Sequence, residues 1–416
     1  MKHLIIGAGP AGVTAAETLR KLDSEADIVL VGNEPEPPYS RMAIPYHLEG
    51  KIDESGTLLR DPEHFDRLGI VVERQHVASL NSERRSVSLE NGSSLDYDRL
   101  LIACGSSPVT PPIPGVDSPR VSSCWTLEDA RRITAAAQPG SRVLLIGAGF
   151  IGCIILESLV KRGVELTVVE TGNRMVPRML DETAGGLLER WCIDKGVRVL
   201  TSTSVEAIED GRTHAVVQLS DGDPIEADHI ITATGVRPNT GWLEGSGIEI
   251  DRGILVDRHM RSNLEQVHAA GDIAQGLDFS TCNYSVQAIQ PTATDHGRIA
   301  ALNMAGRDVE HQGSLNMNIL DTLGLISASF GLWMGVDGGD SARLVNEGEF
   351  RYLNLQFDGE RLVGASSLGL TEHVGVLRGL IESGIELGPW KQRLMDDPTR
   401  IMEAWIGATQ TVGYHP

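Results

Sequence analysis

Two stretches of the chain share one succession of apolar and polar positions. The first holds the apolar run HLII at 3–6, the helical pattern AGVTAAETLRKL at 11–22 and a second apolar run, ADIVLV, at 26–31. The other holds SRVLLI at 141–146, CIILESLVKRG at 153–163 and VELTVVE at 164–170. Short continuous apolar runs are typical of buried parallel strands. Each stretch therefore predicts a strand, a helix and another strand.

A glycine fingerprint of the form GxGxxG lies at the strand-to-helix turn of both stretches. Its members are Gly7, Gly9 and Gly12, and then Gly147, Gly149 and Gly152. Glycines here allow a tight turn and let the backbone approach a pyrophosphate at a helix N-terminus. We therefore expect two dinucleotides. The alternative is that one stretch folds in this way without a ligand.

An acidic residue follows the second apolar run of each stretch, Glu34 in the first and Glu170 in the second. An acid at this place receives ribose hydroxyls, and a free 2′-hydroxyl distinguishes NADH from NADPH. Glu170 therefore favours NADH at the second site. Arg174 and Arg178 follow it closely and leave NADPH as the alternative.

The bulk composition fits a globular protein of two or three domains. The chain has 416 residues, of which 41% are hydrophobic and 22% are charged. No apolar run approaches the ~18 residues of a membrane-spanning helix. The first run follows a single lysine and turns into glycines, which indicates a buried strand and not a signal peptide. We expect a cytoplasmic protein.

The cysteines and the net charge exclude several classes of site and partner. The five cysteines, Cys104, Cys124, Cys153, Cys192 and Cys282, form no CxxC pair, so we expect buried thiols, no disulfide framework and no metal site. The formal charge of −21 comes from 36 basic and 57 acidic residues spread along the chain. Such a field repels nucleic acid and anionic membranes, and it weakens the case for an acidic redox partner.

Three further stretches carry a family resemblance. LLIACGSSP at 100–108 and IITATGVRPN at 230–239 each run into a glycine turn, at Gly105 and Gly235, and VHAAGDIAQ at 267–275 contains Asp272. With the paired fingerprints, they resemble the two-dinucleotide flavoproteins of the pyridine nucleotide-disulfide oxidoreductase superfamily. The resemblance covers about residues 1–306. Within that superfamily the chain is most similar to the rubredoxin and ferredoxin reductases and to nitrite reductase flavoprotein modules.

The resemblance implies an α/β fold with two nested Rossmann-like domains and an α+β C-terminal domain. The implied boundaries are 1–115 and 245–320 for a discontinuous FAD domain, 116–244 for an NAD domain and 321–416 for a C-terminal interface domain. FAD would lie at the first fingerprint, with Glu34, Arg41, Gly105 and Asp272. NAD(H) would lie at the second, with Glu170 and Gly235.

The stretch YSRMAIPY at 39–46 separates the branches of this superfamily. No CxxxxC pair occurs before Cys104, and Met42 stands where one branch carries a single redox cysteine. In the ferredoxin reductase branch, Arg41 matches, but Tyr46 replaces a lysine and Ile154 replaces the glutamate that pairs with it. Loss of both partners of a buried ion pair can be nearly neutral, whereas loss of one is costly. The flavin site is therefore expected to persist with altered control of the nicotinamide. Glu157 could partly replace the missing glutamate carboxylate, or it could be a packing residue.

By family position, His296 and Cys282 would lie near the flavin. His296 could donate a hydrogen bond to the flavin ring, or it could be a structural histidine. The segment FSTCNYSVQAIQP at 279–291 would line the flavin cavity, so Cys282 is the one thiol to test for redox activity.

The C-terminal part shows weaker patterns. RYLNLQFDGERLVGASSLG at 351–369 predicts two strands joined by Asp358 and Gly359. EHVGVLRGLIESG predicts a helix that Gly384 ends, and residues 388–416 have a helical pattern. Trp390 and Trp405 in that last segment either pack at an interface or face a redox partner.

The sequence as a whole predicts an enzyme that passes hydride from NADH to FAD and then electrons to a redox protein or a small acceptor, without a redox-active cysteine. One alternative is an NADH oxidase that reduces oxygen. The other is an FAD-holding electron-transfer subunit of a larger complex with little NADH turnover. A homodimer is possible among such relatives.

Overall fold

The computed structural model describes residues 1–412, which form two compact units. The first unit comprises Met1–Ser107 and Val236–Ser314, and the second comprises Pro108–Gly235 and the chain from Leu315 onward. Two short strands, β8 (Ser106–Pro108) and β17 (Val236–Pro238), occur where the chain passes from one unit to the other. Each unit contains one of the two glycine fingerprints.

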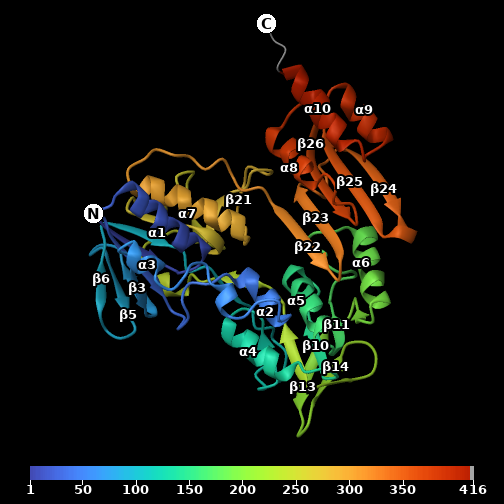
Figure 1. The fold of residues 1–416 in the computed structure, drawn as a ribbon, viewed down its shortest axis with the longest axis horizontal. Helices are drawn as coiled ribbons and strands as arrows, with labels where there is room; N and C mark the ends of the chain where they lie inside the picture. The colour runs from blue at the N-terminus through green and yellow to red at the C-terminus, as the bar shows by residue number, and fades with distance from the viewer. Residues whose placement is uncertain (413–416) are drawn as a thin grey trace. The chain divides into compact units, whose positions relative to one another are not determined.

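The first unit is built on a five-stranded parallel sheet. Its strand order is β19 (Val267–Ala269), β7 (Arg99–Ile102), β1 (Lys2–Ile6), β2 (Asp27–Gly32) and β3 (Val71–Arg74). Helices α1 (Pro10–Leu22) and α7 (Gln290–Met304) lie side by side against it (Figure 1). Gly297 permits this close contact, because a Cβ there would lie 2.2 Å from the Ala11 carbonyl oxygen.

Smaller elements complete the first unit. Two further sheets are formed by β4 (Val77–Asn81), β5 (Ser86–Leu89) and β6 (Ser94–Asp96), and by β18 (Ile254–Leu255), β20 (Ala274–Leu277) and β21 (Tyr284–Ser285). The short helices are η1 (Arg41–Ala43), α2 (Ile44–Leu48), η2 (Ser55–Thr57), α3 (His64–Arg67), η3 (Gly241–Leu243) and η4 (Gly271–Ile273).

The second unit repeats the parallel sheet. Its order is β12 (Arg198–Leu200), β11 (Glu165–Val169), β10 (Arg142–Ile146), β16 (His229–Thr232) and β9 (Val121–Ser123). Its helices are α4 (Leu127–Ala136), α5 (Phe150–Lys161) and α6 (Glu182–Asp194), and a separate hairpin sheet is formed by β13 (Val205–Asp210), β14 (Ala215–Leu219) and β15 (Ile225–Ala227). Both predicted strand-helix-strand units are thus confirmed, and with them the α/β fold class.

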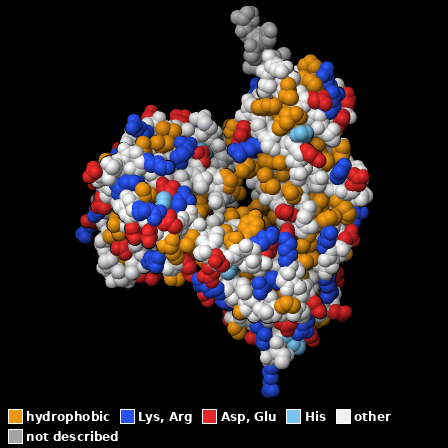
Figure 2. Space-filling model, in the orientation of Figure 1, with side chains coloured by type: hydrophobic (Ala, Val, Ile, Leu, Met, Phe, Trp, Pro, Cys, Tyr) orange, Lys and Arg blue, Asp and Glu red, His pale blue; other side chains and the backbone are white. Residues whose placement is uncertain are grey.

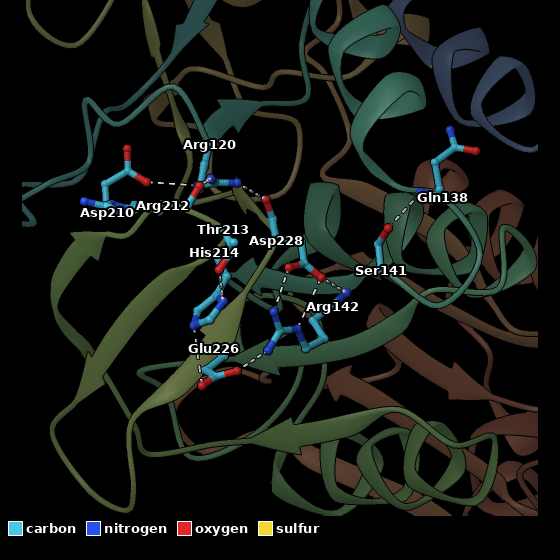
Figure 3. A network of polar contacts seen from close by, with 10 residues as sticks. All are labelled: Arg120, Gln138, Ser141, Arg142, Asp210, Arg212, Thr213, His214, Glu226 and Asp228. Atoms are coloured by element: carbon cyan, nitrogen blue, oxygen red, sulfur yellow. Dashed lines mark hydrogen bonds and ion pairs between the residues drawn. The ribbon is translucent and has the colours of Figure 1, made fainter.

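A network of charged side chains joins this hairpin sheet to the parallel sheet (Figure 3). Arg142, at the start of β10, donates from its backbone amide and its guanidinium to the Asp228 carboxylate at 2.9 and 2.7 Å, and it also pairs with Glu226 of β15. Arg120 pairs with Asp210 at the end of β13, with 2.9 Å between Nε and Oδ1. Because the members are partly exposed, each pair contributes little to stability on its own.

The C-terminal part of the second unit is a five-stranded antiparallel sheet with three helices. Its order is β22 (Met317–Thr322), β23 (Leu325–Gly331), β26 (Arg361–Leu368), β25 (Arg351–Asp358) and β24 (Asp340–Asn346), and the short helix η5 (Glu347–Glu349) precedes β25. The helices are α8 (Val374–Ser383), α9 (Pro389–Asp396) and α10 (Ile401–Val412). The predicted hairpin at Asp358 and Gly359 is confirmed, and so is the helix end at Gly384, whose φ is +58°.

The two faces of this antiparallel sheet have different neighbours. Leu353, with Leu377 of α8 and Ile401 of α10, lines a small cavity between the sheet and its helices. The adjacent residue Tyr352 points to the opposite face, and its hydroxyl donates to Asp181 at the start of α6. The sheet therefore lies between its own helices and the nucleotide-type fold of the second unit.

Both C-terminal tryptophans pack between helices. A Cβ on Gly407 of α10 would lie 2.0 Å from Nε1 of Trp390, and the Arg393 guanidinium lies 4.3 Å from the Trp390 ring centre. Trp405 contacts α8 at Gly379. These contacts favour a packing role over a partner-facing one; residues 413–416 of this segment lie outside the described part of the chain.

Figure 2 shows acidic and basic side chains interspersed over the visible face, as expected for a solvated acidic surface. Within residues 1–412, no helix has both the length and the apolar character that a membrane span requires.

Candidate functional site

The first fingerprint forms an open cradle at the N-terminus of α1. Gly7 has φ +117°, and a Cβ there would lie 2.1 Å from the Ala103 carbonyl oxygen. A Cβ on Gly12 would lie 1.9 Å from the carbonyl oxygen of Gly7, whereas a Cβ on Gly9 would meet nothing within 4 Å. Gly7 and Gly12 are therefore required by packing, and Gly9 faces the space where a phosphate can approach the helix N-terminus.

The second fingerprint repeats this geometry at the N-terminus of α5. A Cβ on Gly147 would lie 2.6 Å from the Ala233 carbonyl oxygen, and one on Gly152 would lie 2.1 Å from that of Gly147. Gly149 again faces open space. The second cradle thus has the same division between packing glycines and an exposed one. Both cradles fit a bound dinucleotide, so neither strand-helix-strand unit has lost its cradle.

Glu34 and Arg41 meet beside the first cradle. Arg41 Nη2 lies 2.6 Å from Glu34 Oε1, and Tyr39 donates its hydroxyl to the other carboxylate oxygen. Both side chains are partly exposed, at 27% and 36%. The acid is therefore fixed in direction but still accessible, as recognition of ribose hydroxyls requires.

Asp272 lies at the same end of the parallel sheet. Ser106 donates to its carboxylate at 2.7 Å, and burial raises its pKa. The neighbouring Gly271 approaches Ala11 at the start of α1, since a Cβ there would lie 3.4 Å from that side chain. Gly105 has φ +66° and open space around its Cα, and it accepts a hydrogen bond from the Asn239 amide at 3.0 Å. Asp272 and Gly105 thus come together near the first cradle.

The carboxylate of Glu170 makes more contacts with the protein than its sequence pattern indicates. It is buried, and its carboxylate accepts from the backbone amides of Ala148 at 2.8 Å and Gly172 at 2.7 Å. Ala148 lies inside the second fingerprint, so Glu170 directly braces the glycine turn. The sequence pattern places an acid here but gives no sign of these two donors.

Arg174 is bound within its own loop. Its guanidinium donates to the carbonyl oxygens of Leu180 at 2.9 Å and Pro177 at 3.2 Å and to the Asn173 side chain at 2.7 Å. These contacts weaken its case as a ligand for a 2′-phosphate and so strengthen the prediction of NADH. Arg178 is exposed.

Tyr46 and Ile154, the residues predicted to lie beside the flavin, belong to different units. Tyr46 lies on α2, is 52% exposed and has the Lys51 ammonium 5.6 Å from its ring centre. Ile154 lies partly buried on α5. Met42 is likewise exposed, at 47%. Gly235 follows β16 with φ +110°, and its carbonyl oxygen accepts from Val109 at 2.9 Å.

Glu157 does not point into a cradle. One of its carboxylate oxygens accepts from the Leu323 amide in the turn between β22 and β23 at 3.1 Å, and the other pairs with Lys161. Packing, the second interpretation of this residue, therefore fits the structure better than a replacement carboxylate.

His296 is buried in the middle of α7. Its Nε2 lies 3.1 Å from the Ser314 hydroxyl, and the His311 ring stands edge-on at 4.8 Å. Burial lowers the pKa of His296 to about 3, so the ring is neutral near pH 7. The structural interpretation of this histidine agrees with these contacts.

The expectation that all five thiols are buried is wrong for Cys282, and Cys104 is only partly buried. This residue is exposed at the turn between β20 and β21, in a left-handed conformation with φ +55°. Burial raises the pKa of Cys104 to about 11 and those of Cys124 and Cys192 to about 12, and it also raises that of Cys153.

Comparison with known proteins agrees with this geometry. The chain is 33% identical over 405 residues to the epsilon subunit of an NADH-dependent phenylglyoxylate dehydrogenase of Aromatoleum evansii, covering 96% of both chains. It is 32% identical to an NADH oxidase of Methanocaldococcus jannaschii, covering 76% of this chain and 72% of that one. The reductase in a solved covalent putidaredoxin reductase–putidaredoxin complex has the same fold, with a TM-score of 0.90, 24% identity and coverage of 98% and 99%.

The pyridine nucleotide-disulphide oxidoreductase family model matches residues 1–297, which include both cradles and Asp272. The chain belongs to this family and is an NAD(P)H oxidoreductase with FAD and NAD(H) as cofactors.

Proposed function

We propose that this enzyme oxidises NADH and passes the electrons to a redox protein, without a redox-active thiol. The observation that carries the proposal is the pair of glycine cradles, one in each unit, that differ in their acidic neighbours. Bound FAD would accept a hydride and release electrons singly or in pairs. No cysteine precedes Cys104 in the sequence, so a thiol at the usual dithiol position is excluded.

Each cradle has its own proposed set of cofactor-binding residues. The FAD site comprises Gly7, Gly9, Gly12, Glu34, Arg41, Gly105 and Asp272. The NAD(H) site comprises Gly147, Gly149, Gly152, Glu170 and Gly235. Glu34 and Glu170 orient the two ribose groups. Tyr46, Ile154 and His296 remain proposed flavin-side residues, of which Tyr46 is the most accessible.

The acceptor has two candidates with separate support. A relative aligned over 96% of both chains is a subunit of a larger dehydrogenase, which favours a role as the flavoprotein subunit of a redox complex. A relative named NADH oxidase supports direct reduction of oxygen instead. The first candidate agrees better with the match over 96% of both chains. We further propose a cytoplasmic location, a homodimer and the three-domain division at 115/116, 244/245 and 320/321.

The first experiment is anaerobic mixing of the FAD-loaded protein with NADH and, separately, NADPH, while the visible flavin absorbance is followed. Rapid bleaching with NADH and slow bleaching with NADPH is the expected result. If neither nucleotide bleaches the flavin although dithionite does, the proposal of NADH oxidation fails. A subunit fed by another protein would then be the remaining function.

A further inference from the structure

The loop at residues 171–180 contacts the glycine turn of the second cradle. The Val176 amide donates to the Ala148 carbonyl oxygen at 2.8 Å, while the Ala148 amide donates to Glu170 at the other side of the turn. The backbone amide of Ala148 is therefore bound by Glu170 at the strand end, and its carbonyl oxygen is bound by Val176 in the loop that follows. Movement of this loop would shift the turn and Glu170 together.

The loop conformation is held against a local preference. Val176 is buried and has φ +42°, a left-handed conformation that a β-branched residue rarely adopts. Such a conformation persists only where surrounding contacts enforce it. The Arg174 guanidinium supplies some of these contacts, through Leu180 and Pro177. Others are supplied at the end of the loop.

Asp181 ends the loop and begins α6. Its Oδ1 accepts from the Ala184 amide at 2.9 Å as the helix N-cap. Its Oδ2 accepts from the hydroxyl of Tyr352 on β25, and Arg343 Nη2 on β24 lies 3.6 Å from the same oxygen. One carboxylate oxygen of Asp181 therefore binds within the nucleotide-type fold, and the other binds the C-terminal sheet.

Tyr352 is suited to this role. Its side chain is fully buried, and burial together with the Asp181 carboxylate raises its pKa, so the phenol remains a donor at every ordinary pH. A hydrogen bond to a carboxylate from a buried donor is among the stronger kinds. Asp181 and Tyr352 are 171 positions apart in the chain.

We infer that Tyr352 is a positioning residue for the nicotinamide nucleotide: through Asp181 it fixes the loop at 171–180, and thereby the C-terminal sheet sets the affinity of the second cradle. The inference rests on the proposed assignment of that cradle to NAD(H). Because Tyr352 acts through Asp181 and the loop, we expect it to change the affinity for the nucleotide and not the rate of the chemical step.

The test is titration of the FAD-loaded protein with NAD⁺ by calorimetry, which measures binding without flavin reduction. Tyr352→Phe keeps the ring and removes the hydroxyl. We expect its dissociation constant for NAD⁺ to rise about five-fold, a part of what a hydrogen bond to a carboxylate can contribute. The rate of flavin reduction at saturating NADH should stay as in the wild type. Amides of the loop should exchange faster with solvent.

The matched control is Tyr97→Phe. Tyr97 is also buried, and within the described residues its hydroxyl has no hydrogen-bond partner, so NAD⁺ affinity should not change. Asp181→Ser keeps an N-cap but loses the oxygen that meets Tyr352. If the contact carries the effect, the double variant Asp181→Ser/Tyr352→Phe should bind NAD⁺ no more weakly than Asp181→Ser alone.

Unchanged NAD⁺ affinity in Tyr352→Phe would overturn the inference, as would an equal loss in Tyr97→Phe or additive losses in the double variant. A wild-type protein that binds no NAD⁺ would overturn the assignment of the second cradle as well. The two failures are thus distinguishable in one titration series.

Discussion

Buried histidines should make the folded protein sensitive to mild acid. His229 and His268 are buried at 4% and 2% exposure, on the central sheets of the second and the first unit. Burial lowers the pKa of His229 to about 4 and that of His268 to about 3. Burial likewise lowers the pKa of His3 and takes that of His296 to about 3. In the unfolded chain the imidazole rings have a pKa of about 6.5.

The sign follows from proton linkage. Since the folded pKa lies below the unfolded one, the unfolded state binds more protons between the two values, and stability falls as the pH falls from about 6.5 toward the folded pKa. At pH 5 each histidine with a pKa near 3 or 4 costs about 2 kcal/mol relative to pH 8. His229, His268 and His296 together cost about 6 kcal/mol, which is comparable with the ~5–15 kcal/mol that stabilises a typical domain.

The assay is urea unfolding of the FAD-loaded protein at pH 7.5 and pH 5.0. His268→Gln removes the titrating ring from the first unit, so the loss of unfolding free energy between the two pH values should shrink by about 2 kcal/mol in the transition of that unit. His229→Gln should do the same in the second unit. Exposed carboxylates titrate alike in variant and wild type and therefore cancel.

The matched control is Asn91→Gln, because it changes an exposed side chain that does not titrate. Its pH dependence should equal that of the wild type. If His268→Gln also retains the full pH dependence of the wild type, burial of the neutral ring does not govern acid stability, and the reasoning is refuted.

Three further predictions concern the cradles and the thiols. Gly12→Ala should lower both the melting temperature and the amount of bound flavin, because its Cβ would lie 1.9 Å from a backbone oxygen. Gly9→Ala should fold normally and lose only flavin. Circular dichroism measures the folding of each variant, and the flavin-to-protein absorbance ratio measures its bound flavin. Glu170→Gln should raise the KM for NADH about ten-fold with a smaller effect on kcat, since it weakens two amide contacts of the glycine turn, and an unchanged KM in steady-state kinetics would contradict this role. Ellman's reagent should modify one thiol quickly in the native protein, and Cys282→Ser should abolish that phase while retaining NADH-dependent flavin reduction, because burial raises the pKa values of the other four thiols; a persisting fast phase would show a second accessible cysteine.

The sequence by itself determined the elements whose signals are local. The two glycine fingerprints, the parallel strands around them and the hairpin at Gly359 follow from residues that lie within about thirty positions of one another. The acid at Glu170 was recognisable for the same reason, because strand, helix and strand set its distance from the turn. Family membership followed from the order of these signals.

Only the tertiary structure decided which polar groups meet across long separations. No sequence motif singles out Asp181, because its partner Tyr352 lies on a strand 171 residues later. Glu157 binds a turn amide that no spacing pointed to, and Arg174 binds its own loop. The physical reason is that burial and hydrogen-bond partners depend on which surfaces pack together. The residues next to a given position in the sequence carry little information about that packing.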